Sequence, residues 1–327
     1  MFARRRLLLL ATTAAAVSAT AVVPSAYAAT GAAPSFAGRQ ALTLGTGVTD
    51  PRAVAVADLD GDGRPDLVAG SGNGGTGMVT VLRGTGGGAF AAPLGSPFGF
   101  ATAGGVGAIA VGDLNGDGRD DVLAAIGSGT TDNDELVPLA GDGTGALSAG
   151  TPVAVAGVQL AGVALVDLDG DGDLDALTAS TTAVTAEQLG VVEQTPSGLG
   201  VAGSAGATGT TLASAVAAGD LTGDGLPDAL VVSANSGTGS AWVASGGGLA
   251  LTAGTPVDVG ADPVAVAVGD VDGDGDLDGL VLDGAANLLT VLRNDGAGTL
   301  TASGVLVDGL ATGNGLATGD LNGDGHL

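Results

Sequence analysis

The stretch Asp58–Asp66, with the sequence DLDGDGRPD, recurs in recognisable form six times along the chain. Carboxylates stand at its first, third, fifth and ninth positions, and glycines stand at its fourth and sixth. Oxygen side chains at alternating positions of a tight loop can converge on one point, and glycine lets the backbone curl without steric cost. Ca²⁺ takes about six to eight hard oxygen ligands in a flexible geometry, whereas Mg²⁺ keeps more of its waters. The stretch therefore predicts a calcium loop.

An EF-hand loop begins in a similar way, but it needs a bidentate Glu at its twelfth position and a helix on each side. The twelfth positions of the five complete copies are Ala69, Ala124, Thr178, Val231 and Val281. The flanks read as strands, with Ala53–Ala57 before the first loop and Leu67–Ala69 after it. We therefore expect a calcium loop inside a β-hairpin, closed by the Asp at the ninth position.

The copies recur at a nearly constant interval of 50 to 55 residues. They begin at Asp58, Asp113, Asp167, Asp220, Asp270 and Asp320, and we number them loop 1 to loop 6. A period of this length indicates a propeller or a solenoid rather than a single mixed core. No stretch after the N-terminal segment shows the periodicity of an amphipathic helix.

Each interval accommodates four short strands separated by Gly-rich turns, which matches one propeller blade. In the first interval these strands are Ala53–Ala57, Asp66–Ala69, Met78–Leu82 and Phe90–Leu94. The strand before each loop carries small or β-branched residues, which suit the crowded position near a propeller axis. We expect the inner strands to be Ala53–Ala57, Ala108–Val111, Val163–Val166, Ala213–Ala218 and Val264–Val268.

The pattern Asp-x-Asp/Asn-Gly-Asp-Gly-x-x-Asp, preceded by an Ala/Val-rich strand, resembles the FG-GAP/VCBS repeat family. That family includes the calcium-binding blades of integrin α-subunit propellers and many secreted bacterial proteins. The resemblance covers roughly Phe36 to the end of the chain. It implies an all-β propeller of four-stranded antiparallel blades that binds Ca²⁺, and the family commonly forms seven blades.

The resemblance also implies that the seventh position of each loop contributes a backbone carbonyl, so that any residue can stand there. The predicted ligands are Asp58, Asp60, Asp62, Arg64 and Asp66 in loop 1; Asp113, Asn115, Asp117, Arg119 and Asp121 in loop 2; Asp167, Asp169, Asp171, Asp173 and Asp175 in loop 3; Asp220, Thr222, Asp224, Leu226 and Asp228 in loop 4; Asp270, Asp272, Asp274, Asp276 and Asp278 in loop 5; and Asp320, Asn322 and Asp324 in loop 6.

Metal-free Asp-Gly turns are the alternative for these loops, since Asp and Gly favour turns. Such turns would vary in spacing, yet the pattern of oxygen side chains at positions one, three, five and nine holds in all five complete copies. Loop 4 is expected to bind calcium most weakly, because Thr222 offers only a neutral hydroxyl.

The sixth copy stops at Leu327, before its ninth position. A chain that ends inside a calcium loop suggests a truncated sequence. We expect five full blades and the start of a sixth in these residues, and seven blades in the complete protein.

The first 28 residues are expected to be an export signal. Arg4–Arg6 make a positive start, Leu7–Val23 is an apolar run, and Ala26–Ala28 is a small-x-small cleavage site. Sec and twin-arginine export both remain open, and an N-terminal membrane anchor is the alternative. Residues 29–34 are expected to be a flexible lead-in and residues 35–327 the propeller. Ser35–Leu42 resembles 89–94 and predicts an outer strand that completes the last blade.

The chain is strongly acidic, with 35 acids, nine arginines, no lysine and a formal net charge of −26. Such a surface repels nucleic acid and anionic membranes, so neither is an expected partner. The high content of Val, Leu and Ala argues against disorder. Because the chain has no Cys, no disulfide can stabilise an exported fold, and bound metal would have to do so.

The residue inventory disfavours an enzyme. His326 in the incomplete loop 6 is the single histidine, and there is no cysteine, which excludes a Ser-His-Asp triad elsewhere and a His-rich zinc site. Paired carboxylates can hydrolyse glycosides, but here each cluster belongs to a repeated loop, and an active site would not recur in every blade.

Two molecular roles remain open for the secreted, monomeric protein that we expect. One is a structural or adhesion module that binds an extracellular protein or glycan. The other is a propeller lectin or a non-catalytic domain of a secreted carbohydrate-active enzyme. Sugar sites and protein hot spots both depend on aromatic residues. No aromatic recurs from blade to blade, and Trp242 is expected to pack inside a blade, which favours the first role.

Overall fold

The computed structural model describes residues 42–45, 48–72, 76–91, 98–100, 104–127, 133–156, 158–183, 189–205, 212–235, 238–286, 288–306, 315–320 and 326–327. Within these ranges every regular element is a β-strand. The expected signal and lead-in, nearly all of the strand expected at Ser35–Leu42, and Asn322 and Asp324 of loop 6 lie outside them. None of the described residues forms a helix that could span a membrane.

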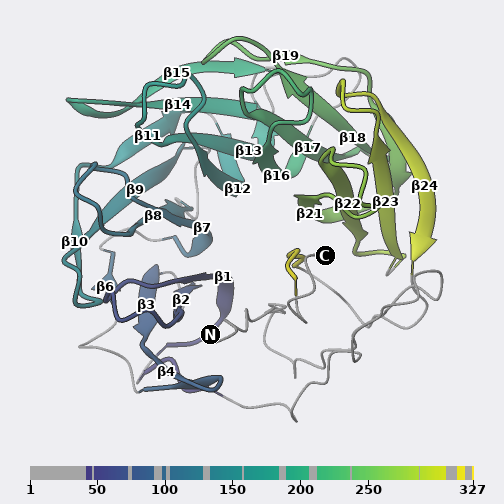
Figure 1. The fold of residues 1–327 in the computed structure, drawn as a ribbon. Helices are drawn as coiled ribbons and strands as arrows, with labels where there is room; N and C mark the ends of the chain where they lie inside the picture. Colours follow the sequence, from purple (N-terminus) through teal and green to yellow (C-terminus); the bar gives the residue numbers. More distant parts are fainter. Residues whose placement is uncertain are drawn as a thin grey trace.

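The strands form five antiparallel blades arranged around a common axis (Figure 1), which confirms the expected β-propeller. Blade 1 contains β1 (Pro51–Ala57), β2 (Asp66–Ser71), β3 (Met78–Leu82) and β6 (Phe98–Gly99); blade 2 contains β7 (Val106–Gly112), β8 (Asp121–Ile126), β9 (Asn133–Gly141), β10 (Leu147–Ala149) and β11 (Val153–Ala156); blade 3 contains β12 (Val158–Val166), β13 (Asp175–Ala183), β14 (Leu189–Thr195) and β15 (Gly198–Ala205); blade 4 contains β16 (Ala213–Gly219), β17 (Asp228–Asn235), β18 (Thr238–Ser245), β19 (Thr252–Ala253) and β20 (Val257–Gly260); and blade 5 contains β21 (Pro263–Gly269), β22 (Asp278–Asp283), β23 (Leu288–Asn294) and β24 (Leu300–Leu306).

Blades 2 and 4 vary the four-stranded plan at their outer edge. In blade 2 the outer position is shared by β10 and β11, which both pair with β9. In blade 4 it is shared by β19 and β20, which both pair with β18. One parallel pair, Val158 with Asn133, also links blades 2 and 3 into a single hydrogen-bonded sheet. The repeat therefore keeps three strands intact and tolerates variation in the fourth.

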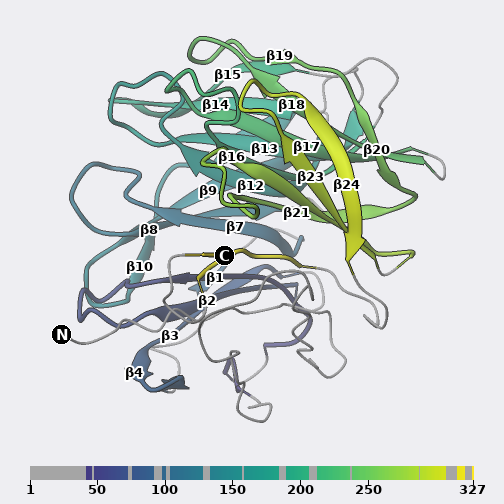
Figure 2. The ribbon, with the colours of Figure 1, turned by 45° about the vertical axis from the view of Figure 1, so that its right-hand side comes forward.

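The strand before each loop lies nearest the axis, as the sequence predicts. The inner strands β1, β7, β12, β16 and β21 follow one another around the ring, each beside the next (Figure 1). In both views β24 runs along the outer edge of blade 5 (Figure 2). Small side chains allow the inner strands to converge, whereas β2, β8 and β22 are buried along their whole length.

Apolar side chains fill the space between neighbouring blades. Four buried clusters correspond to the four interfaces from blade 1 to blade 5. Trp242 is fully buried between blades 3 and 4, beside Leu177 and Val231, so its expected packing role is confirmed. Each cluster also takes residues from the loops, for example Leu59 from loop 1 between blades 1 and 2. The positions of the loops are therefore tied to the core.

The fourth strand expected at Phe90–Leu94 in blade 1 is wrong. Only Ala89–Phe90 form a strand, β5, which turns back onto β4 (Gly84–Gly86). The positive φ angles of Gly86, Gly87 and Gly88 make this tight return possible. The outer partner of β3 is instead β6, whose Phe98 packs edge-on against Phe100 with ring centroids 5.2 Å apart.

The described residues 315–320 lie beside the inner strand of blade 5. The hydroxyl of Thr318 donates to the carbonyl of Val268 over 2.8 Å, and Leu327 packs against Gly269. Figure 1 shows this end of the chain near the axis, past β21. The contact has the direction expected of the next blade in the ring, although residues 315–320 form no strand.

Candidate metal centre

The five complete loops all lie at one end of the propeller. Each connects an inner strand to the second strand of its blade, as loop 1 connects β1 to β2 (Figure 1). The two strands pair in register up to the loop, so that Ala57 stands opposite Asp66. An antiparallel hairpin thus presents seven residues between its paired ends, and the carboxylates must be arranged within that turn.

Glycines at the fourth and sixth positions shape the turn. In loop 1, Gly61 and Gly63 have φ angles of 69° and 81°, a left-handed region that side chains disfavour. The equivalent glycines of the other four complete loops also have positive φ angles. This conformation turns successive backbone N–H groups toward the inside of the loop, where carboxylates can accept them.

The same hydrogen bonds recur in every complete loop. The first carboxylate accepts the N–H of the sixth residue, over 2.7 Å between Asp58 and Gly63 and over 2.7 to 3.1 Å in the other loops. The fifth carboxylate accepts the N–H of the seventh residue over 2.9 to 3.0 Å, as Asp62 does from Arg64. These bonds fix two of the predicted ligands in each loop before any ion is considered.

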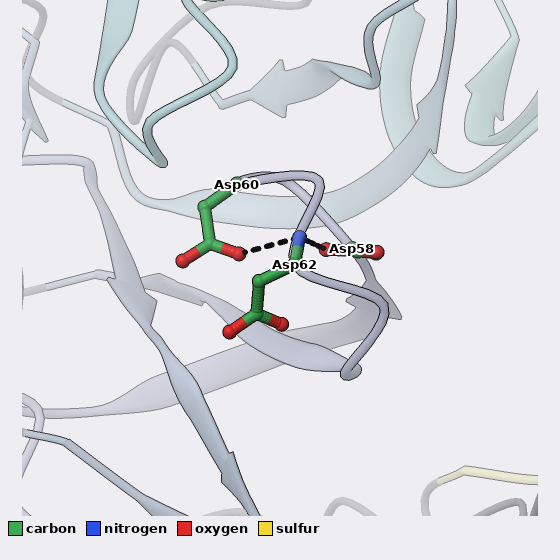
Figure 3. A group of neighbouring side chains, drawn as sticks. All are labelled: Asp58, Asp60 and Asp62. Atoms are coloured by element: carbon green, nitrogen blue, oxygen red, sulfur yellow. Dashed lines mark hydrogen bonds between the residues drawn. The ribbon is translucent and has the colours of Figure 1, made fainter.

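Three loops bring three carboxylates to one point. An oxygen of each of Asp58, Asp60 and Asp62 lies within 4.8 Å of the other two in loop 1. Figure 3 shows these side chains leaving one turn of the chain, with the N–H of Asp62 between Asp58 and Asp60. The equivalent groups are Asp167, Asp169 and Asp175 in loop 3, and Asp270, Asp272 and Asp278 in loop 5.

The other predicted ligands are not gathered in this way. Among the described residues, loops 2 and 4 form no such group of three acids, and these two loops have Asn115 and Thr222 in place of the third carboxylate. The third-position Asp is therefore the feature that separates the loops. In loop 6, Asp320 alone is described.

The ninth-position Asp is buried and held by backbone N–H groups. Asp66, which is fully buried, accepts the N–H of Leu59 over 3.0 Å and that of Gly84 over 2.7 Å. Burial raises its pKa, partly offset by these bonds, and the nearby Asp60 and Asp58 raise it further. The pKa values of Asp121, Asp175, Asp228 and Asp278 are raised for the same first reason, burial. A cation in the loop would favour the charged form.

Loop 4 differs at both of its unusual positions. Asp228 accepts the N–H groups of Leu221 and Thr222, each over 2.9 Å, through one carboxylate oxygen, Oδ2. Its other oxygen, Oδ1, is buried without a hydrogen-bond partner, as is the hydroxyl oxygen of Thr222. The hydroxyl lies near enough to lower the pKa of Asp228 slightly, but burial dominates and raises it.

Arginines reach the loops from two directions. Arg64 and Arg119 at the seventh position pair with the fifth-position carboxylates of their own loops, over 3.0 and 3.4 Å. Arg83 after β3 and Arg293 on β23 pair with the third-position carboxylates Asp60 and Asp272. Sequence reasoning missed the second pair, because the arginines lie more than 20 residues from the loops they contact. Their one signal is the equal spacing of Arg83 and Arg293 after their loops.

Neighbouring loops also touch across the blade interfaces. The eighth-position residues Leu174 and Leu277 pack against Gly112 and Gly219, which end the inner strands of the preceding blades. In loop 2 the eighth residue is Asp120, whose carboxylate accepts the backbone N–H of Asp58 in loop 1. Burial, followed by the charges of Asp58 and Asp113, raises the pKa of Asp120.

The loop pattern matches a known repeat. The model of the FG-GAP-like repeat matches residues 58–124, 116–178, 220–281 and 270–327, which together make up more than half of the chain. The chain belongs to the FG-GAP-like repeat family. Each match to an FG-GAP-like repeat begins at or inside one of the loops described above, so the family signal and the site geometry coincide. A search of curated proteins found no match.

Solved structures with the same architecture have low sequence identity to this FG-GAP-like repeat protein. A protein assigned as a 6-phosphogluconolactonase from Bacteroides fragilis superposes with a TM-score of 0.56 at 16% identity, covering 79% of this chain and 70% of that one. The Vibrio cholerae biofilm matrix protein Bap1 gives 0.44 at 19% identity, over 79% and 40% of the two chains. At this identity the first likeness supports the fold alone.

Proposed function

We propose that this chain is a secreted, calcium-binding FG-GAP-like repeat propeller that acts as a structural or adhesion module. The observation that carries the proposal is the recurrence of one carboxylate group at the same place in loops 1, 3 and 5. Exposed acidic groups occur without metal, but three matched groups on glycine-shaped loops are the arrangement that a hard divalent cation requires.

The residues fit Ca²⁺ by their chemistry. In loop 1, Asp58, Asp60 and Asp62 would bind through carboxylate oxygens, Arg64 through its backbone carbonyl, and Asp66 would close the site. Bound calcium would supply positive charge at the point where these carboxylates repel one another, and repulsion at such distances is only partly screened by salt. The chain itself contributes the glycines and the N–H groups that hold the carboxylates in place.

Secretion would explain why the stability of the fold depends on metal. The N-terminal segment has the pattern of an export signal, and the chain has no Cys for disulfides. Extracellular calcium modules bind at about 10⁻⁴ to 10⁻³ M, so the loops would be filled only after export. The mature chain would be a monomer, and it would have no affinity for nucleic acid or anionic membranes because of its charge.

A non-catalytic role fits the repetition of the site. Carboxylate groups that recur in blade after blade serve the architecture, whereas an active site needs one distinct constellation. The partner would be an extracellular protein or glycan. A lectin role has less support, because the only tryptophan, Trp242, is fully buried, and Phe98 packs against Phe100. A glycan array screened with the full-length secreted protein tests that choice.

Calorimetric titration of the calcium-free protein with CaCl₂ tests the central proposal, with MgCl₂ as the matched control. We expect calcium to bind at several sites per chain and to raise the melting temperature by about 10 °C or more at 10 mM, since each filled site adds stability by mass action. Magnesium should give a much smaller shift. No binding heat and an unchanged melting temperature in calcium would refute the proposal and leave the loops as turns.

A further inference from the structure

We propose that one residue on the third strand of each blade tunes the calcium affinity of the loop beneath it. Arg83 and Arg293 would weaken binding at loops 1 and 5, and Glu193 would strengthen it at loop 3. This inference rests on the proposed calcium site and assigns a role to residues outside the nine-residue loop motif.

The three residues occupy one register position. In each blade the ninth-position Asp accepts a backbone N–H from the third strand, donated by Gly84 in blade 1, Gln194 in blade 3 and Asn294 in blade 5. The residue immediately before each donor is Arg83, Glu193 and Arg293, respectively. Because side chains alternate along a strand, equal register directs these residues to the same face.

Loops 3 and 5 make a natural comparison. Their nine residues differ only at the buried second position, where Leu168 stands in loop 3 and Val271 in loop 5. Both loops gather the first, third and ninth carboxylates. The charge on the third strand is therefore the main difference between the two sites, since Glu193 in one corresponds to Arg293 in the other.

The arginines contact a predicted ligand directly. Nε of Arg83 lies 3.4 Å from Oδ2 of Asp60, and Arg293 forms an ion pair and hydrogen bond with Asp272. The two carboxylates are largely covered, with side-chain exposures of 7% and 10%, while the arginines remain about half exposed at 46% and 53%. Each arginine thus partly neutralises its loop when no metal is bound.

This pairing must oppose metal binding. Calcium either displaces the guanidinium from the carboxylate or binds beside it and is repelled by its positive charge. Coulomb's law for a unit charge about 6 Å from a divalent ion, in a watery and salt-screened setting, gives a loss of affinity of about threefold to tenfold. A carboxylate at the same position acts in the opposite direction. Loop 3 would therefore fill with calcium before loops 1 and 5.

Crystals of the full chain equilibrated with graded calcium concentrations allow a test, because anomalous peaks report the occupancy of each loop separately. In the wild-type protein loop 3 should reach half occupancy at a lower calcium concentration than loop 5. Arg293→Ala and Arg83→Ala should each lower the half-saturating concentration of their own loop by about threefold to tenfold. Glu193→Arg should raise that of loop 3 by at least as much.

Two matched variants control the interpretation. Arg52→Ala removes the same charge from the far end of β1, where Arg52 pairs with Asp50, and should change no loop. Arg83→Lys keeps the charge without the guanidinium fork and should leave loop 1 within about twofold of wild type. Calcium titrations of the same variants in solution should show that the differences shrink in 0.5 M KCl, because salt screens exposed charges.

The outcomes separate this inference from the proposed function. If calcium fills the loops but Arg293→Ala and Glu193→Arg leave their half-saturations unchanged, or if the effects do not depend on salt, third-strand tuning is wrong and the calcium site stands. If calcium fills no loop of the wild-type protein at 10 mM, the proposed function itself fails.

Discussion

The carboxylate of Asp66 accepts a hydrogen bond of 2.7 Å from the backbone N–H of Gly84, which lies 18 residues further along the chain. The same relationship links Asp121 with Gly141, Asp175 with Gln194 and Asp278 with Asn294. Because this Asp also accepts an N–H from the start of its loop, it ties the loop to the third strand of its blade. A predicted metal ligand is thus also a structural link.

Replacing Asp66 with Ala should destabilise the protein with or without calcium. The substitution leaves the N–H groups of Leu59 and Gly84 without their acceptor in a buried position, at a cost of about 1–3 kcal/mol each. Urea denaturation in EDTA, followed by the fluorescence of the buried Trp242, measures the effect. Asp62→Ala is the matched control, because Asp62 is an exposed predicted ligand, and its effect should appear mainly in calcium.

If Asp66→Ala were as stable as wild type in EDTA, the carboxylate would serve only as a ligand. A loss confined to calcium would have the same meaning. Asp66→Asn adds a further check, because the amide keeps one acceptor oxygen and should recover part of the stability in EDTA while still weakening loop 1.

Replacing Asn294 with Ala should loosen the interface between blades 4 and 5. Its side-chain amide donates to the carbonyl of Leu221 over 2.7 Å and to that of Leu277 over 3.0 Å, so one buried side chain joins loops 4 and 5. Loss of these bonds should cost about 2–4 kcal/mol in the free energy of unfolding. Thr301→Ala on the exposed face of β24 should cost less than about 0.5 kcal/mol. Equal stability of the two variants would contradict this account.

Much of the fold can be predicted from the sequence because the repeat states the same information several times. The loop motif has a fixed spacing, and the Ala/Val-rich stretch before each copy places an inner strand with little ambiguity. Burial of Trp242 follows from its place in an apolar strand. The outer strands carry weaker patterns, since their residues are partly exposed and their turns vary. This is why the fourth strand of blade 1 was misplaced.

Contacts that cross between distant segments could not be predicted in the same way. The link from Asp66 to Gly84 uses a backbone N–H, which leaves no mark on residue type. Arg83 and Arg293 do carry a signal, their equal distance from their loops, but it becomes meaningful only when the strand register is known. The gathering of carboxylates in loops 1, 3 and 5, and not in loops 2 and 4, does follow the residue at the third position.

Replacing Thr222 with Asp should strengthen calcium binding at loop 4. The loop has carboxylates at positions one, five and nine, and affinity in such sites follows the ligand charge. Asp is close to Thr in size, so the change adds a carboxylate with little added volume. We expect loop 4 to fill last in the wild-type protein and at least about tenfold more readily in the variant, as occupancy in crystals at graded calcium would show.

Thr222→Val is the matched control, because it keeps the shape and removes the oxygen. It should fill no more readily than wild type, and it relieves a hydroxyl that is buried without a partner, so the metal-free protein should keep its stability. If loop 4 filled first in the wild-type protein, the expected ranking of the sites would be wrong.

The stabilisation by calcium should disappear on acidification. Burial raises the folded-state pKa values of Asp66, Asp121, Asp175, Asp228 and Asp278 above the ordinary value of 3.8. A raised folded-state pKa means that the metal-free native state binds protons more tightly than the unfolded chain. For these groups, metal-free stability is therefore greatest below 3.8 and falls as the pH rises through the folded-state values.

Calcium reverses this trend, because it needs the carboxylates in their charged form. Protons and calcium compete for the same groups, so the melting temperature in 10 mM CaCl₂ should fall toward that of the calcium-free protein as the pH is lowered from 7 to about 4.5. Asp142 and Asp295 have lowered pKa values from hydrogen bonds within exposed turns, and they act with the opposite sign in both conditions. They therefore cancel in the difference between the two melting curves. A difference that stays constant across this pH range would mean that calcium acts elsewhere than on the buried carboxylates.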